Sequence, residues 1–171
     1  MRWAVLVGLA VLGGCHGDVA VSPPEQQRTQ LDPTALGPFV RMSQINAERH
    51  FVSGVYQLED NAWRWCGGKA VLRVRLGTLD GLKFLMKHAV PVQVIGRAKT
   101  VRMRLLINGK PWEEMVYEKD GIYEIQKPAP VKWLQPNAEN VITIEVDKPL
   151  PAQGDRPEMG FILVHVGFQP G

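Results

Sequence analysis

The sequence has few cysteines, little net charge and no long hydrophobic run. Two cysteines in 171 residues exclude a disulfide-rich scaffold and a zinc site built from four thiolates. The formal net charge is only +3, which does not by itself indicate a nucleic-acid ligand. With 45% hydrophobic and 22% charged residues, the chain is too apolar for a disordered protein and too charged for a protein with several membrane spans. This length fits one folded domain or a small pair.

Catalytic and metal-binding patterns are also missing from the sequence. His16, His50, His88 and His165 have no metal-ligand spacing. There is no glycine-rich phosphate loop and no Ser/His/Asp arrangement. We therefore expect a protein that is not an enzyme and that has no metal and no cofactor.

The first fifteen residues have the pattern of an export signal. One positive charge precedes an apolar run of eleven residues, from Ala4 to Gly14. A membrane-spanning helix needs about 20 residues, so this run has the length of a signal-peptide core. It ends in Leu12-Gly13-Gly14-Cys15, which resembles the bacterial lipobox. The resemblance implies a lipoprotein signal peptide over 1–14 and a lipid on Cys15, with acyl chains such as palmitate as the membrane anchor. A plain secretory cleavage near the two glycines is the alternative.

Residues 15–45 are interpreted as a lipidated tether, because Pro, Gln, Ser and Gly concentrate there. Apolar residues between Pro33 and Asn46 have spacings of three and four, which allow a brief helix. We expect a bacterial cell-envelope protein held on a membrane by its lipid, with its domain exported from the cytoplasm and no nucleic-acid partner. By resemblance to the enterobacterial sorting rule, Asp18 at mature position four favours the outer over the inner membrane.

Residues 46–171 are predicted to form a β domain, because apolar and polar residues alternate with period two. The clearest examples are 70–76 and 100–107, and Asn108-Gly109 after the second is a strong hairpin signal. About nine strands are expected, and no long amphipathic helix follows residue 46. The pattern predicts an all-β fold, an antiparallel two-sheet sandwich of the jelly-roll kind. The expected strands are 52–58, 70–76, 82–88, 92–96, 100–107, 112–117, 121–126, 141–146 and 160–168.

Charge is segregated along this domain. From Arg64 to Lys110 there are eleven basic residues and one acid, whereas from Pro111 to Gly171 there are ten acids and five basic residues. Arg73 and Arg75 share one strand face, as do Arg102 and Arg104. Acidic strands beside basic strands would cancel these charges locally. The alternative is an exposed basic face that meets an anionic envelope surface.

The segments Gly54–Glu59, Trp63-Arg64-Trp65, Ala70–Leu76 and Asp155–Leu163 occur in the order found in a group of bacterial envelope modules. The chain resembles these β-sandwich modules, which are also appended to membrane glycosyltransferases, over residues 50–168. The final motif differs: Asp155-Arg156 lacks an intervening residue, and Met159 replaces the usual Leu. The resemblance implies a galactose-binding-like jelly roll and an association with glycans, without catalysis.

Several residues are candidates for contact with a glycan or a protein partner, and each has a structural alternative. Trp63 and Trp65 share a strand face and could stack on sugar rings, or they could belong to the core. Arg64 and Glu59 could form an ion pair with each other or bind hydroxyl groups. The remaining candidates are Asp155 and Arg156, which could instead fix their loop, and Trp112 beside the Asn-Gly turn.

Cys66 would be left unpaired by lipidation of Cys15, and it is expected to be buried rather than nucleophilic. The leading hypothesis is a lipid-anchored, non-catalytic envelope protein that binds carbohydrate. The second hypothesis is a structural or protein-interaction module of an envelope assembly. The sequence does not indicate an oligomeric state.

Overall fold

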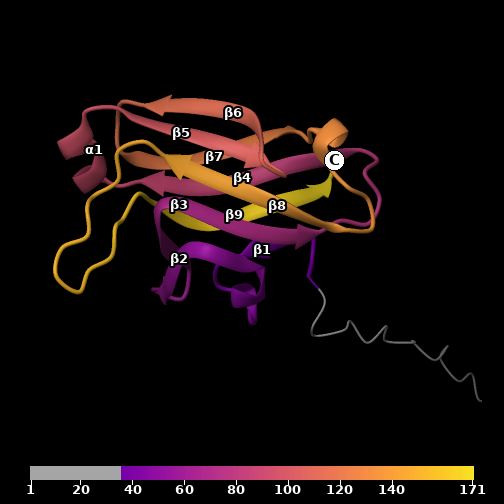
Figure 1. The fold of residues 1–171 in the computed structure, drawn as a ribbon, viewed down its shortest axis with the longest axis horizontal. Coiled ribbons are helices and arrows are strands. Elements are labelled where there is room, and N and C mark those ends of the chain that lie inside the picture. The colour runs from indigo at the N-terminus through magenta and orange to yellow at the C-terminus, as the bar shows by residue number, and fades with distance from the viewer. Residues whose placement is uncertain (1–35) are drawn as a thin grey trace, which may run out of the picture. The chain divides into compact units, whose positions relative to one another are not determined.

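The computed structural model describes residues 36–171, which form an antiparallel β domain (Figure 1). Within the described residues, helix is confined to three short segments, η1, α1 and η2. The elements are β1 (Phe39–Arg41), η1 (Ala47–His50), β2 (Phe51–Glu59), β3 (Trp63–Arg75), β4 (Leu82–Val90), α1 (Val92–Ala98), β5 (Val101–Ile107), β6 (Lys110–Tyr117), β7 (Gly121–Pro128), η2 (Val131–Trp133), β8 (Glu139–Val146) and β9 (Phe161–Pro170).

The two layers of the fold are joined through β3, which has 13 residues. Its N-terminal part pairs with β9, in register Arg64–Leu163 to Cys66–Phe161. Its C-terminal part pairs with β8, from Lys69–Glu145 to Arg75–Glu139. The hydrogen-bonded order is therefore β6-β5-β8-β3-β9-β4-β7, with β2 beside β3 and β1 beside β9. The sheet curls back on itself at β3, so that β8-β5-β6 faces β9-β4-β7 across the core. This is the predicted all-β, antiparallel jelly-roll-like arrangement.

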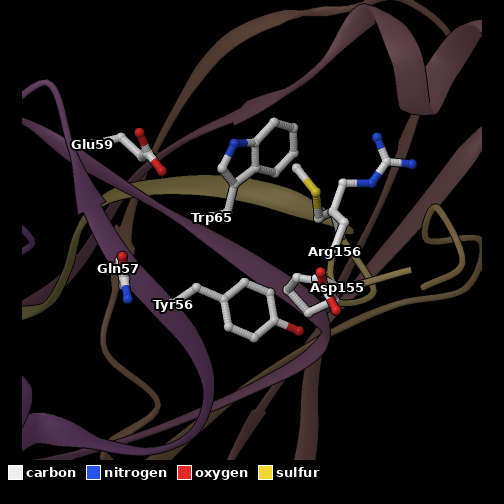
Figure 2. Close-up of a pocket in the computed structure, with 8 residues that line it drawn as sticks. Tyr56, Gln57, Glu59, Trp65, Asp155 and Arg156 are labelled. Carbon is white, nitrogen blue, oxygen red and sulfur yellow. The ribbon is translucent and has the colours of Figure 1, made fainter. Parts of the chain in front are cut away.

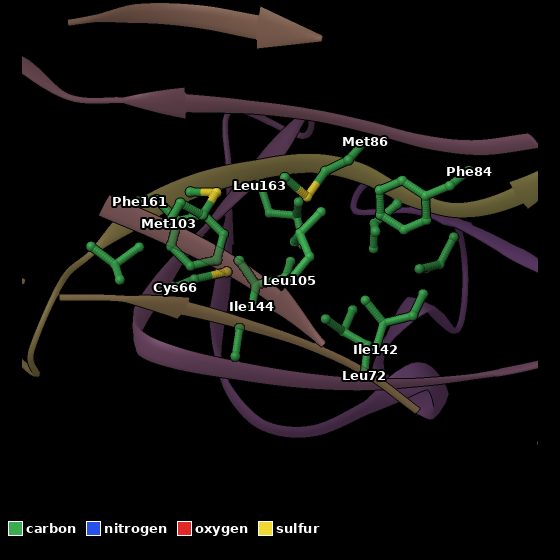
Figure 3. Close-up of a cluster of buried hydrophobic side chains, with 14 of the residues drawn as sticks. Cys66, Leu72, Phe84, Met86, Met103, Leu105, Ile142, Ile144, Phe161 and Leu163 are labelled. Carbon is green, nitrogen blue, oxygen red and sulfur yellow. The ribbon is translucent and has the colours of Figure 1, made fainter. Parts of the chain in front are cut away.

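The core lies between these layers and is built from the alternating apolar residues that the sequence indicated (Figure 3). In β5 the side chains of Val101, Met103, Leu105 and Ile107 are fully buried, whereas Arg102 and Arg104 are exposed. Phe84 and Met86 in β4 belong to the same buried cluster as Phe161 and Leu163 in β9. Full burial of each such side chain contributes about 1.5–3 kcal/mol, so one dry face per strand is sufficient to fix strand register.

The Asn108-Gly109 hairpin is confirmed. Asn108 has φ 49° and Gly109 has φ 76°, the positive values that a two-residue hairpin turn requires. The Asn108 amide also donates to the carbonyl of Trp133 at 2.7 Å and to the side-chain oxygen of Asn140 at 2.8 Å. The turn thus also anchors the segment between β7 and β8.

The predicted strand over 92–96 is wrong, because Val92–Ala98 is the helix α1. Pro91 precedes the first turn, and its carbonyl accepts hydrogen bonds from the amides of Val94 and Ile95. Val94 is buried, Ile95 and Ala98 pack against the core, and Val92 is 58% exposed. These apolar residues follow helical spacing rather than alternation.

In residues 36–46 the structure does not contain the brief helix expected between Pro33 and Asn46. Phe39–Arg41 is instead a strand, β1, which pairs with β9 at Val40–Val166. Val40 and Met42 are fully buried in the core. The folded domain therefore includes residues assigned to the tether, and the expected boundary at residue 46 falls within a packed segment. The remainder of the tether, the signal peptide and Cys15 lie outside the residues that the structure describes.

Candidate functional site

A hollow of about 540 Å³ lies at the end of the domain where β2 and the start of β3 meet the loop between β8 and β9 (Figure 2). β2 and β3 contribute two aromatic side chains, an amide and a carboxylate, and the loop adds one acidic and one basic residue, a proline and a methionine. The lining residues are Tyr56, Gln57, Glu59, Trp65, Asp155, Arg156, Pro157 and Met159.

An irregularity in β2 brings three of its residues to this hollow. Simple alternation would place Tyr56 and Gln57 on opposite faces. The pairing of β2 with β3 changes register between Val55 and Leu58, however, so both of these side chains reach the same site as Glu59. The aromatic wall and the polar rim of the hollow therefore depend on this irregular stretch.

The loop between β8 and β9 is held against β2 and β3 by Glu158. The hydroxyl of Tyr56 donates to the Glu158 carbonyl at 2.8 Å, and the Gly68 amide donates to Glu158 Oε1 at 2.8 Å. A Cβ at position 68 would lie 2.7 Å from Glu158 Oε1 and 2.9 Å from Pro149 Cγ, so a larger residue there would displace the Glu158 side chain from this contact. A pair of backbone hydrogen bonds between Leu150 and Met159 closes the base of the loop. These contacts position the loop residues that line the hollow.

The charged groups around the hollow are largely free of protein partners. Neither Glu59 nor Asp155 has an ion pair or a side-chain hydrogen bond with any residue in 36–171. The guanidinium of Arg156 donates to the Gln153 side-chain oxygen at 3.3 Å, on its own loop. Burial raises the pKa of Tyr56, and the nearby Glu158 carboxylate adds to this rise. A flat aromatic surface with free polar groups at its rim suits a polyhydroxylated ligand.

Four of the seven candidate binding residues are brought together here: Glu59, Trp65, Asp155 and Arg156. Asp155 and Arg156 form no ion pair with each other within the described part of the chain. Trp63 is half-buried and packs edge-on against Trp65, with ring centroids 6.2 Å apart, but it does not line the hollow. Four residues of the lining were not among the predicted site residues: Tyr56, Gln57, Pro157 and Met159.

Arg64 does not line the hollow, and neither of the two alternatives, an ion pair with Glu59 or contact with ligand hydroxyls, applies to it. Its side chain is 7% exposed, and it pairs instead with Glu48. Its Nε donates to the carbonyl of Met42 at 3.2 Å, and Nη1 donates to the carbonyl of Tyr56 at 3.0 Å. Arg64 is thus a structural residue that joins η1 and the preceding turn to β2 and β3.

Trp112 is likewise placed away from the hollow. Its ring meets Phe84 edge-on, with centroids 4.9 Å apart, and it packs against the core where β6 faces β4. Cys66 is fully buried, as expected, and burial raises the pKa of its thiol well above the usual value. A thiol of this kind is a poor nucleophile.

Acidic strands neutralise much of the basic segment, in agreement with the first of the two interpretations. Glu145 on β8 lies between Lys69 on β3, at 3.1 Å, and Arg104 on β5, at 3.2 Å. Similar pairs join Arg73 to Glu139, Arg102 to Glu114 and Lys87 to Glu124. Arg73 and Arg75 point outward, as predicted.

Residues 36–171 contain neither a metal-binding cluster nor a helix that could span a membrane. No group of three or more His, Cys, Asp or Glu side chains there is arranged to hold a metal ion. In the same range, no helix has the length and hydrophobicity needed to cross a membrane.

No family model and no curated protein matches the sequence. Solved structures do resemble the fold. An acetyl xylan esterase, Est2A, from Butyrivibrio proteoclasticus gives a TM-score of 0.43 at 13% identity, over 80% of this chain and 34% of the esterase chain. A GH26-CBM35 β-(1,4)-mannanase from Podospora anserina gives a TM-score of 0.45 at 9% identity, over 78% of this chain and 27% of the mannanase chain.

A family 35 carbohydrate-binding module from an environmental isolate gives a TM-score of 0.41 at 10% identity, over 78% of this chain and 96% of the module. In contrast to its match with this module, the chain spans only about a third or less of the esterase and mannanase chains. At these values the likenesses do not assign a function, and the site has to be judged from its own side chains.

Proposed function

We propose that this protein is a non-catalytic carbohydrate-binding protein and that its ligand occupies the hollow around Trp65. The observation that carries the proposal is the combination in Figure 2: two aromatic side chains, Trp65 and Tyr56, line one hollow together with Glu59, Gln57 and Arg156. The volume of about 540 Å³ is in the range of small-molecule sites, which measure about 300–1,000 Å³.

Binding would combine stacking with hydrogen bonds. The C–H face of a pyranose ring packs on an indole, and the ring hydroxyls at its edge bond to carboxylate, amide and guanidinium groups. Trp65 is half-buried, which limits the side-chain entropy lost on binding. The polar residues Gln57, Glu59 and Asp155 are exposed and must exchange water for ligand hydroxyls. This exchange favours moderate affinity and selectivity based on hydroxyl orientation.

The test is a glycan array followed by titration calorimetry of the best ligand. Trp65→Ala should weaken binding by about tenfold or more, because a central aromatic contact contributes ~1.4 kcal/mol or more. Trp133→Ala is the matched control, since it removes the same type of side chain outside the hollow while the backbone carbonyl that Asn108 contacts remains. Equal binding by the wild type and Trp65→Ala would refute the proposed site.

The alternative function, a structural or protein-interaction module, has less support. The large apolar side chains that are at least half exposed come from separate segments of the chain rather than from one element. They are Ile45, Val52, Val92, Val116, Ile122 and Val131.

We further propose that a lipid on Cys15 anchors the domain in the bacterial cell envelope, at the outer rather than the inner membrane. The support for the lipid is the lipobox-like segment that ends at Cys15, and the support for the outer membrane is Asp18 at mature position four. Cys15→Ser should abolish palmitate labelling and release the protein into the soluble fraction, whereas Cys66→Ala should remain bound and labelled. Membrane retention of Cys15→Ser would reject the anchor, and density-gradient separation would identify the membrane.

A further inference from the structure

The hollow is lined by two carboxylates that have no ion-pair partner in residues 36–171 and by one guanidinium that is hydrogen-bonded to a neighbouring side chain. Glu59 on β2 and Asp155 on the β8–β9 loop are both exposed carboxylates without an ion-pair partner in residues 36–171. In Figure 2, Glu59 lies beside Trp65, and Asp155 lies on the loop side of the hollow, nearer to Tyr56. The single cation of the lining, Arg156, bonds to Gln153, and its guanidinium is directed away from Glu59. A ligand at the centre of the hollow therefore meets more available negative than positive charge.

The walls between these carboxylates also attract cations. Trp65 and Tyr56 present π-systems whose faces are electron-rich, and a cation over an indole gains about 0.5–1 kcal/mol even at an exposed site. Met159 adds a polarisable thioether to the same lining. A negative rim around aromatic walls is unfavourable for an acidic sugar and favourable for a positively charged one.

We propose, on the basis of the carbohydrate-binding function above, that the site selects sugars with a free, protonated amino group over their N-acetylated or acidic counterparts. Trp65 would carry the sugar ring, as in the proposed function. Glu59 and Asp155 at the rim would attract the ammonium group, so that the residues responsible for selectivity differ from the residue responsible for stacking.

The probes are glucosamine oligomers and N-acetylglucosamine oligomers of the same linkage and length, together with uronic-acid oligomers. Titrations at about pH 6 keep an aliphatic amine protonated and carboxylates ionised. The amino oligomer should bind roughly tenfold more tightly than its N-acetylated counterpart, the effect of two exposed ion pairs of about fivefold or less each. Added salt should reduce this ratio, because exposed charges are screened over about 10 Å at 0.1 M.

Three isosteric variants assign the effect to residues. Glu59→Gln and Asp155→Asn should each lower the ratio of amino to N-acetylated binding by about two- to fivefold, while binding of the N-acetylated oligomer stays the same. Arg156→Gln should strengthen binding of the amino oligomer. Asp80→Asn, an exposed carboxylate beyond the opposite end of β3, is the matched control and should change neither affinity.

Equal binding of the two oligomers, a preference for the uronic-acid oligomer, or loss of all binding in Arg156→Gln would overturn the amino-sugar inference. If Trp65→Ala still weakened glycan binding in those cases, the amino-sugar inference would be rejected and the proposed carbohydrate-binding function would be retained. Absence of binding to these probes and to every glycan on the array would overturn the proposed function and the inference together.

Discussion

His88 is a buried titratable group that makes the stability of the domain depend on pH. It lies on β4, which pairs with β9 and β7, and its side chain is fully buried. Its Nε2 lies 2.8 Å from the hydroxyl of Tyr117 on β6, and its ring stacks on Tyr123 of β7 with centroids 5.8 Å apart. Nδ1 has no hydrogen-bond partner in the described residues. No carboxylate is positioned to stabilise an imidazolium here.

Burial lowers the pKa of His88 from the ordinary value of 6.5 to about 4. Between these values the unfolded chain binds the proton and the folded chain does not, so acid favours unfolding. Above pH 6.5 His88 is neutral in both the folded and the unfolded chain, so it no longer makes the unfolding free energy depend on pH. At about 1.4 kcal/mol per pH unit, His88 should remove about 3 kcal/mol of unfolding free energy as the pH falls from 6.5 to 4.

The assay is urea unfolding followed by tryptophan fluorescence at several pH values, for the wild type and His88→Gln. Glutamine does not titrate and retains a group that can bond to the Tyr117 hydroxyl. Burial also lowers the pKa of His50 and His165, so the measured quantity is the difference between the two proteins. As the pH falls from 6.5 to 4, the unfolding free energy of the wild type should decrease by about 3 kcal/mol more than that of the variant. Parallel pH profiles would refute the assignment of a neutral, buried His88.

Two further predictions concern residues beside the site. Arg64→Met should destabilise the domain by about 2–4 kcal/mol in urea unfolding, because it leaves buried carbonyl groups unsatisfied. Arg75→Met, which loses one exposed hydrogen bond to the Asn137 carbonyl, should cost less than about 1 kcal/mol, and equal losses would contradict the structural role of Arg64. Cys66 should react with a thiol reagent only when the domain unfolds; rapid modification of the native protein would show that it is accessible.

The strands that were predicted well are those with one dry and one wet face. β5 is the clearest case, because its four buried apolar residues alternate with residues that include Arg102 and Arg104. A slip of one residue would bury both arginines, so the sequence strongly specifies the register. The Asn-Gly turn was predictable for a local reason as well, since it needs only the two turn residues to adopt positive φ.

Short apolar stretches were predicted poorly. Val92–Ala98 and Phe39–Arg41 exchanged helix and strand relative to expectation, and neither is longer than seven residues. Periodicity cannot separate the two conformations over so few positions. Pro91 decided the first case by preceding a helical turn, and pairing with β9, more than 120 positions later in the chain, decided the second.

The composition of the site illustrates both the strength and the limit of strand periodicity. Adjacent residues of a strand face opposite sides, so in Trp63-Arg64-Trp65 an outward Trp65 requires an inward Arg64. Alternation therefore already implied that Arg64 and Trp65 could not both line one hollow. It could not reveal Tyr56 and Gln57, which share the site because β2 shifts register, nor Met159, which arrives on a loop held by Glu158. Strand periodicity locates a site on one face of a sheet, whereas its full set of residues depends on tertiary contacts that local sequence does not record.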